Sequence, residues 1–240
     1  LLSAGGKINK TLNGTFSVGG NHRIFKYESV QQIGRNRDLE NLWIIENMKS
    51  IESAKYSSAK TVNSLYFAGQ LAYNNYLFLD VTGRNDWSST LGRNNYSFFY
   101  PSVSSSFVFT DLDAFRASFL SYGKLRLSYG QAGNDADPYL TKAGYFLGSI
   151  PFVGGQRMMG ISSSIPLGDL KNELTSSFEA GTELKFWNDR LGIDLTYYDA
   201  TTENQIMQVK LPVSTGYSTK LINAGAIRNR GLELLLTGSI

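Results

Sequence analysis

The sequence has no cysteine and a single histidine, His22, among its 240 residues. Without cysteine the chain forms no disulfide and offers no thiolate ligand, and one histidine makes a histidine-based metal centre unexpected. A nucleophile activated by histidine would depend on His22, and the carboxylates are scattered along the chain. We therefore predict no catalytic residue, no metal site and no cofactor, and we do not expect an enzyme.

Dense positive charge and long apolar runs are also missing. The 23 Lys and Arg residues stand against 20 Asp and Glu residues, and they form no basic cluster of the kind that binds nucleic acid. The uncharged stretch 94–110 is interrupted by Pro101 and by several serines. It falls short of the ~20 apolar residues that a membrane helix needs. A nucleic-acid partner and a transmembrane helix are therefore not expected.

Glycine and aromatic residues are abundant, since the chain has 24 Gly and 13% aromatic residues but only 5 Pro. This composition is typical of strands and turns. Near residue 125, Leu125, Leu127 and Tyr129 fall on one face of a strand, and Lys124 and Arg126 fall on the other. The same period of two predicts strands over residues 12–20, 62–73, 76–84, 99–110, 122–132, 173–186, 190–204 and 221–237.

The links between these strands alternate between short and long. The short links are 74–75, 111–121 and 187–190, and the long links are 21–60, 85–98, 133–172 and 205–220. If neighbouring strands are antiparallel, all the short links lie at one end of the sheet. Short periplasmic turns, long extracellular loops and strands of ~10 residues are typical of outer-membrane barrels. We therefore predict an all-β fold, an antiparallel transmembrane β-barrel segment of about 8 strands.

In such a barrel the apolar side chains face lipid and the polar ones face a wet lumen. Within the uncharged stretch, this places Val103, Phe107 and Phe109 against hydrocarbon and Ser104 and Ser106 toward water. Aromatic residues near the predicted strand ends are expected to form interfacial girdles: Tyr73, Tyr76, Tyr100, Tyr129, Trp187, Tyr197 and Tyr198. Charged residues of the lumen face are expected to pair across strands or to meet a plug: Lys124, Arg126, Glu179, Glu183, Lys185, Asp194 and Glu233.

Two other architectures fit the same alternation. A soluble β-rich module for glycan binding or adhesion would also alternate, but its apolar face would pack against a second layer. That layer would cover Leu125, Leu127, Ile193 and Leu195. A small closed pore of ~8 strands would fit the strand count, and its first and last strands would pair with each other. We expect neither the second layer nor that pairing.

Five segments resemble the SusC/RagA family of TonB-dependent outer-membrane transporters, in the same order and with similar gaps. They are "NYLFLDVTGRNDWSSTL" (75–91), "FFYPSVSSSFVFTD" (98–111), "KLRLSYGQAGND" (124–135), "LTSSFEAGTELKF" (174–186) and "INAGAIRNRGLELLL" (222–236). The segment "NGTFSVGGN" near the N-terminus fits less specifically. The resemblance covers residues 61–240. One such segment alone would be a weak indication of the family, but five in the same order are a strong one.

The resemblance implies a plugged barrel of ~22 strands in the bacterial outer membrane. It further implies import of oligosaccharides or peptides, a SusD-like surface lipoprotein as partner, and energy from the TonB complex. The plug and the segment that contacts TonB belong outside the matched region in this family. We therefore expect residues 1–240 to form a partial barrel domain, with the plug and the remaining strands absent.

Ligand contacts are expected in the long links, because the lipid face carries no ligand. Aromatic residues there can stack on sugar rings or grip a peptide: Trp43, Trp87, Tyr96, Phe98, Tyr139, Tyr145 and Phe146. Arg84, Asp86 and Arg93 can bind ligand hydroxyls. The alternative is that the aromatic residues pack loop on loop and that the charged residues form an ion-pair and turn network. The acidic segment 133–138 lacks the closing Glu of a calcium loop and is predicted to be a turn.

Overall fold

The computed structural model describes residues 1–115, 119–148, 156 and 158–239. One antiparallel sheet dominates it, and short 3-10 helices lie in the connections. The long strands are β2 (Leu12–Arg37), β3 (Met48–Tyr73), β4 (Leu77–Ser88), β5 (Ser97–Val108), β6 (Leu120–Asn134), β10 (Glu173–Phe186), β11 (Leu191–Lys210) and β12 (Thr219–Gly238). The short strands are β1 (Leu2–Lys7), β7 (Tyr145–Leu147), β8 (Met159–Ile161) and β9 (Ser164–Ile165). No helix in the described ranges is long and apolar enough to cross a membrane.

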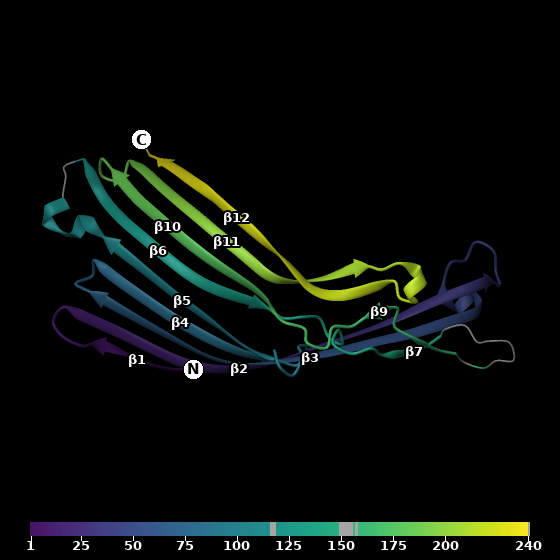
Figure 1. Cartoon of the computed structure of the whole chain (residues 1–240). Coiled ribbons are helices and arrows are strands. Elements are labelled where there is room, and N and C mark those ends of the chain that lie inside the picture. The colour runs from purple at the N-terminus through teal and green to yellow at the C-terminus, as the bar shows by residue number, and fades with distance from the viewer. Residues whose placement is uncertain (116–118, 149–155, 157, 240) are drawn as a thin grey trace.

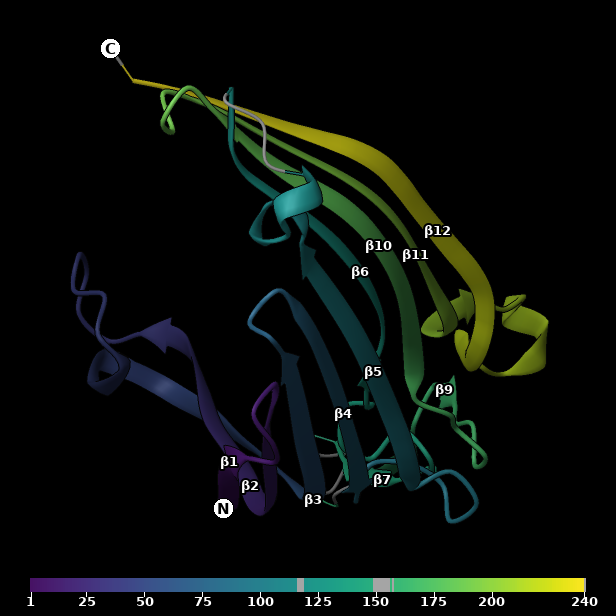
Figure 2. The same ribbon diagram turned by 90° about the vertical axis from the view of Figure 1, so that its left-hand side faces the viewer.

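The sheet has ten strands in the order β1-β2-β3-β4-β5-β6-β10-β11-β12-β9, and β7 and β8 form a separate hairpin. Its strands lie side by side in one curved layer (Figures 1 and 2). Nearly every neighbour is the next strand in the chain, and only β9 pairs in parallel. The all-β antiparallel prediction is therefore confirmed. Among the described residues β1 does not pair with β12 or β9, so the sheet is not a closed eight-stranded pore.

The side chains of the two faces follow the predicted alternation. Leu127 lies between Ser105 of β5 and Ala180 of β10, and its side chain is 54% exposed. Leu125 and Leu195 are exposed on the same face. No described element covers this apolar face, so the second layer that a soluble sandwich needs is not found. The opposite, polar face carries Arg126, Asp194 and their neighbours, which form cross-strand hydrogen bonds.

The turns at one end of the sheet are tight, as predicted. Asn74 and Asn75 both have positive φ, at 47° and 59°, which matches the turn that joins right-handed twisted strands. Residues 187–189 also have positive φ. Aromatic rings gather beside these turns: Tyr73, Tyr76, Phe107, Phe109 and Phe115 form a chain of contacts, and Phe119, Phe186 and Trp187 form another. Three residues of the predicted girdle, Tyr73, Tyr76 and Trp187, lie in these two ring clusters.

The prediction of a long link over 21–60 was wrong. Strands β2 and β3 each run for 26 residues, and only residues 38–47 form the tip between them. In Figure 1 this hairpin continues past the ends of β4 and β5. Between Val62 and the tip, both faces of the hairpin carry polar side chains. The alternation of apolar and polar residues therefore predicts strands that are too short. His22, predicted to lie in a loop, is an exposed residue of β2 whose Nδ1 lies 2.5 Å from Asn63 Oδ1.

Strand β1 was also missed, because its six residues include glycine and alanine instead of an alternating pattern. Strands β11 and β12 extend closer to their connection than predicted, to Lys210 and from Thr219. Tyr100 was predicted to join an interfacial girdle. It instead lies buried on the polar face, because residue 100 pairs with Arg84.

Candidate functional site

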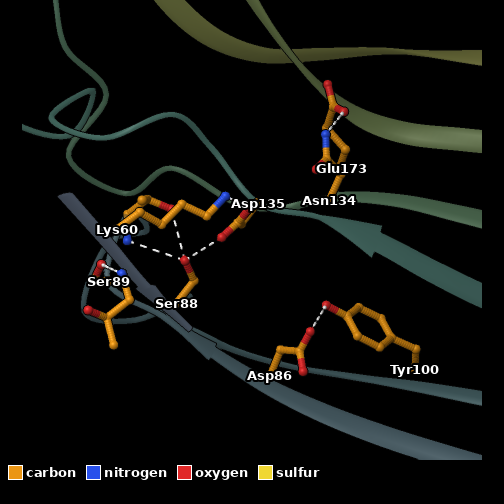
Figure 3. Close-up of polar contacts among 10 residues, drawn as sticks. Lys60, Asp86, Ser88, Ser89, Tyr100, Asn134, Asp135 and Glu173 are labelled. Carbon is orange, nitrogen blue, oxygen red and sulfur yellow. Dashed lines mark hydrogen bonds and ion pairs between the residues drawn. The ribbon is translucent and has the colours of Figure 1, made fainter. Parts of the chain in front are cut away.

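Polar side chains converge on the polar face at the end of the sheet that bears the long connections (Figure 3). They come from β3, β4 and β5 and from the start of the connection between β6 and β10. Arg84 and Asp86 reach this face because they alternate with Asn85 and Trp87 along β4. Their partners across the ladder, Tyr100 and Phe98, share the face.

Lys60 and Asp135 form an ion pair between β3 and the β6–β10 connection. The second carboxylate oxygen of Asp135 accepts a hydrogen bond from Ser88 Oγ at 2.6 Å, and Ser88 Oγ lies 2.9 Å from Thr90 Oγ1. The side chain of Asp135 is only 10% exposed and that of Lys60 is 22% exposed. Partial burial strengthens the attraction compared with an exposed pair. This network therefore fastens the start of the long connection to the wall.

A second network lies next to it on the polar face of β3, β4 and β5. Arg84 Nε donates to Asp86 Oδ1 at 2.7 Å, and Arg84 Nη2 donates to Ser64 Oγ at 2.8 Å. Tyr100 Oη donates to Asp86 Oδ2 at 3.2 Å. Asp86 is thus held by both a guanidinium and a phenol, with little exposure to water. The predicted alternative, an ion-pair network of Arg84 and Asp86, matches this arrangement.

A cavity of about 240 Å³ opens between the two networks. Its lining includes Lys60, Asp135 and Asp86, together with the aromatic rings of Phe25 and Phe98. Arg23 also lines it, with its guanidinium 5.5 Å from the Phe25 ring centroid. Among the described residues no carboxylate pairs with Arg23. The cavity therefore combines a free cation with aromatic faces, which suits a polar ligand that carries an acidic or hydroxyl group.

The long connections have a small core of their own. Leu170 is completely buried among Leu91, Ala136 and Leu221, and these come from three different connections or strand ends. Partly buried apolar side chains surround this core: Phe98, Leu140, Leu167 and Ile206. The amides of Asn94 and Asn95 both donate to Asp169. The connections therefore pack on one another and do not hang free above the sheet.

A larger hollow of about 840 Å³ lies between the β4–β5 connection and the β6–β10 connection. Arg93 and Tyr139 line it from opposite sides, together with Lys142 and Asp169. At the same end of the wall, Asn134 Nδ2 donates to Glu173 Oε2 at 3.3 Å, and Glu173 Oε1 accepts from the Ile206 N–H. The described residues contain no group of three or more His, Cys, Asp or Glu side chains placed to hold a metal ion.

The family model described as TonB dependent receptor-like, beta-barrel, matches residues 2–239. The chain belongs to this family. Among curated TonB-dependent receptors, P26 of Formosa agariphila is 31% identical over 194 residues, and SusC of Bacteroides thetaiotaomicron is 29% identical over 194 residues. The first match covers 78% of this chain and the second 76%, and each covers 19% of the relative. The chain therefore spans about a fifth of the length of these receptors.

Solved receptor structures share the fold. The RagAB peptide transporter superposes with a TM-score of 0.87 at 22% identity, over 99% of this chain and 27% of that one. The siderophore receptor PirA from Acinetobacter baumannii gives 0.61 at 14% identity, over 98% of this chain and 33% of that one. The predicted resemblance to the SusC/RagA family is confirmed by these receptors together.

The predicted ligand residues of this wall are divided between the small cavity, the larger hollow and positions outside both. Asp86 and Phe98 line the small cavity, and Arg84 holds Asp86 on the same polar face. Arg93 and Tyr139 line the larger hollow. The other predicted residues do not join either space: Trp43, Trp87, Tyr96, Tyr145 and Phe146. Alternation places Trp87 on the apolar face with Leu79 and Val81. Tyr96 is exposed in its connection, Tyr145 and Phe146 lie in β7, and Trp43 stacks under Arg37 at the hairpin tip.

The sequence does not predict four residues of this candidate site: Arg23, Lys60, Tyr100 and Asp135. Arg23 and Lys60 fell within the predicted link 21–60, and Asp135 was assigned to a simple turn. A local signal does exist for Tyr100, since it shares its phase of the alternation with Ser104 and Ser106, which are predicted to face water. The Lys60–Asp135 contact joins residues 75 positions apart and leaves no local pattern.

The Tyr100 ring rests on Gly133, which gives a direct test of the site. A Cβ on Gly133 would lie 2.2 Å from Tyr100 Cε1, so the ring has to move if the residue is alanine. We expect Gly133→Ala to destabilise the full receptor by about 1–3 kcal/mol and to break the bond from Tyr100 to Asp86. Urea unfolding of the purified receptor measures the loss. Gly130→Ala is the control, because its Cβ meets only Ser102 Cβ at 3.3 Å. Equal losses for both variants would contradict the packing role of Gly133.

Proposed function

We propose that this chain is part of the barrel wall of a TonB-dependent importer in a bacterial outer membrane. The observation that carries the proposal is the single-layer sheet, with an uncovered apolar face and an ion-paired polar face. Leucines of the last strand, Leu232, Leu234 and Leu236, continue the apolar face. Hydrocarbon satisfies such a face and water satisfies the other. The remaining strands and the plug are proposed to come from sequence outside residues 1–240, because the sheet is open and the match covers only 19% of the relative.

The proposed cargo is an oligosaccharide or a peptide, taken up with a SusD-like lipoprotein and with energy from the TonB complex. Relatives named SusC and RagAB support this assignment, since the latter is described as a peptide transporter. We propose Phe98, Arg93 and Tyr139 as ligand contacts, with Arg84 and Asp86 shaping the cavity beside them. Tyr96 and Tyr145 stay candidates for contacts with a ligand or partner above the membrane, whereas Trp87, on the apolar face, is proposed to contact lipid or a partner instead of ligand.

An uptake assay tests this function. Cells that lack the full-length gene are expected to lose uptake of one labelled oligosaccharide or peptide from a mixed panel, and the intact gene is expected to restore it. Because TonB transmits energy from the inner membrane, a protonophore is expected to abolish the restored uptake. Uptake of every panel member at the same rate with and without the gene, or restored uptake that survives the protonophore, would reject the proposal.

A further inference from the structure

Strand β3 has a long open edge. It pairs with β2 from Met48 to Tyr73, but it pairs with β4 only from Val62 onward. Between Met48 and Thr61, no strand of the described ranges lies on the other side of β3. The β7–β8 hairpin in the nearby connection pairs only with itself. Proteins usually shorten or cover such edges, because unpaired N–H and C=O groups recruit another strand.

Hydrogen bonds at the sheet end of this edge show which groups it presents. Thr61 O accepts from Ser89 N at 3.0 Å, and Thr61 N donates to Ser89 Oγ at 3.0 Å. Ala59 N donates to Tyr139 Oη at 3.2 Å. In an antiparallel strand every second residue directs its N–H and C=O to the same side. Three exposed residues continue this alternation toward the hairpin tip: Ser57, Lys55 and Ser53. Their edge-side groups have no partner among the described residues.

The open edge leads to the small cavity. Lys60 ends it on the polar face and also lines the cavity, together with Phe25 of the paired strand. Tyr56 projects from the same face of β3 and contacts the Tyr27 ring, with centroids 6.1 Å apart. A strand added here would place alternate side chains next to Tyr56 and Lys60. Its end nearest the sheet would stop beside Tyr139, whose hydroxyl already accepts from the Ala59 N–H.

We propose that this edge, from Ser53 to Ser57, binds an extended peptide by strand addition. The inference rests on the importer function above and narrows its cargo to peptides. Main-chain hydrogen bonds supply affinity with little dependence on peptide sequence, and side chains beside Tyr56 supply selectivity. An oligosaccharide has no regular series of N–H and C=O groups, so it cannot use this edge in the same way.

Methylated peptides test the pairing directly. The full-length receptor in lipid nanodiscs is titrated with a soluble heptapeptide selected from a casein digest by its binding to the receptor. Two synthetic versions of that peptide then carry N-methyl groups on alternate backbone nitrogens, one in each phase. A strand paired along one edge uses only one phase of N–H groups. We expect one version to bind about tenfold or more weakly, and the other to bind as the parent does. Equal affinities for the two versions would overturn the proposal.

A pair of receptor variants supplies the matched control. Ser57→Pro removes one edge N–H, and proline is tolerated at an unpaired edge. Ser57→Ala removes the hydroxyl and keeps the N–H. We expect the proline variant to bind the peptide about tenfold more weakly and the alanine variant to bind it normally. If the proline variant keeps its peptide affinity but no longer forms a complex with the SusD-like lipoprotein, the edge is a protein-docking site and the proposal is overturned. Uptake of an oligosaccharide without any peptide binding would also overturn it, and would leave the importer function standing.

Discussion

Replacing Leu127 with arginine is expected to destabilise the full-length receptor by about 2–4 kcal/mol in a phospholipid bilayer. Leu127 lies near the middle of β6, where it pairs with Ser105 and Ala180 on the apolar face and is more than half exposed. A guanidinium at this depth either loses its contact with water or distorts the bilayer to keep that contact. The free energy of unfolding in urea, measured in vesicles, reports the loss.

The neighbouring residue provides the control. Ser128 lies on the polar face, between Ser104 and Glu179. An arginine there reaches water and the Glu179 carboxylate, so Ser128→Arg is expected to cost less than about 1 kcal/mol. Similar costs at the two positions would mean that lipid does not contact the apolar face. The membrane orientation of the wall would then be wrong.

Replacing Asp135 with alanine is expected to release the start of the β6–β10 connection, at a cost of about 2–3 kcal/mol. The substitution leaves the half-buried Lys60 ammonium without its anion and Ser88 without its acceptor. Limited proteolysis of the full-length receptor is expected to cut within residues 138–168 at least tenfold faster. Asp137→Ala is the control, because it removes the same charge from an exposed residue two positions away.

A double substitution separates the ion pair from general damage to the loop. Lys60→Met combined with Asp135→Ala removes both charges, so no unpaired ion is left in the partly buried site. We expect this double variant to recover most of the resistance to protease that Asp135→Ala loses. A double variant that is cut as fast as the single one would show that the carboxylate acts through Ser88 instead of Lys60.

The alternation of apolar and polar residues predicted most of the wall, because one environment on each face leaves a period of two in the sequence. The strands around Leu127 and Leu195 were found in this way. The pattern disappears where both faces of a strand meet water, and this is why the sequence predicts a loop for the part of the β2–β3 hairpin between Val62 and the tip. Alternation also separates Trp87 from Arg84 and Asp86, although all three stand within one short segment.

The candidate site was harder to predict than the wall. Its pieces are near the ends of strands, where contacts such as Lys60 with Asp135 and Tyr100 with Gly133 depend on how distant segments fold together. Such contacts involve single polar residues or glycines, which have no periodicity. Arg84 and Asp86 were identified because they are close in sequence, and their pairing with each other follows from that closeness.

The small core around Leu170 has an evolutionary consequence. The long connections have their own hydrophobic core, in which Leu170 packs against Leu91 and Leu221. They can therefore be exchanged as one unit while the strands beneath stay unchanged. New cargo preferences would then arise by swapping residues 136–170 between related barrels, provided that Leu170, Leu91 and Leu221 are kept. Chimaeras that replace one of these three leucines should still be expressed, but their long connections should no longer pack on one another.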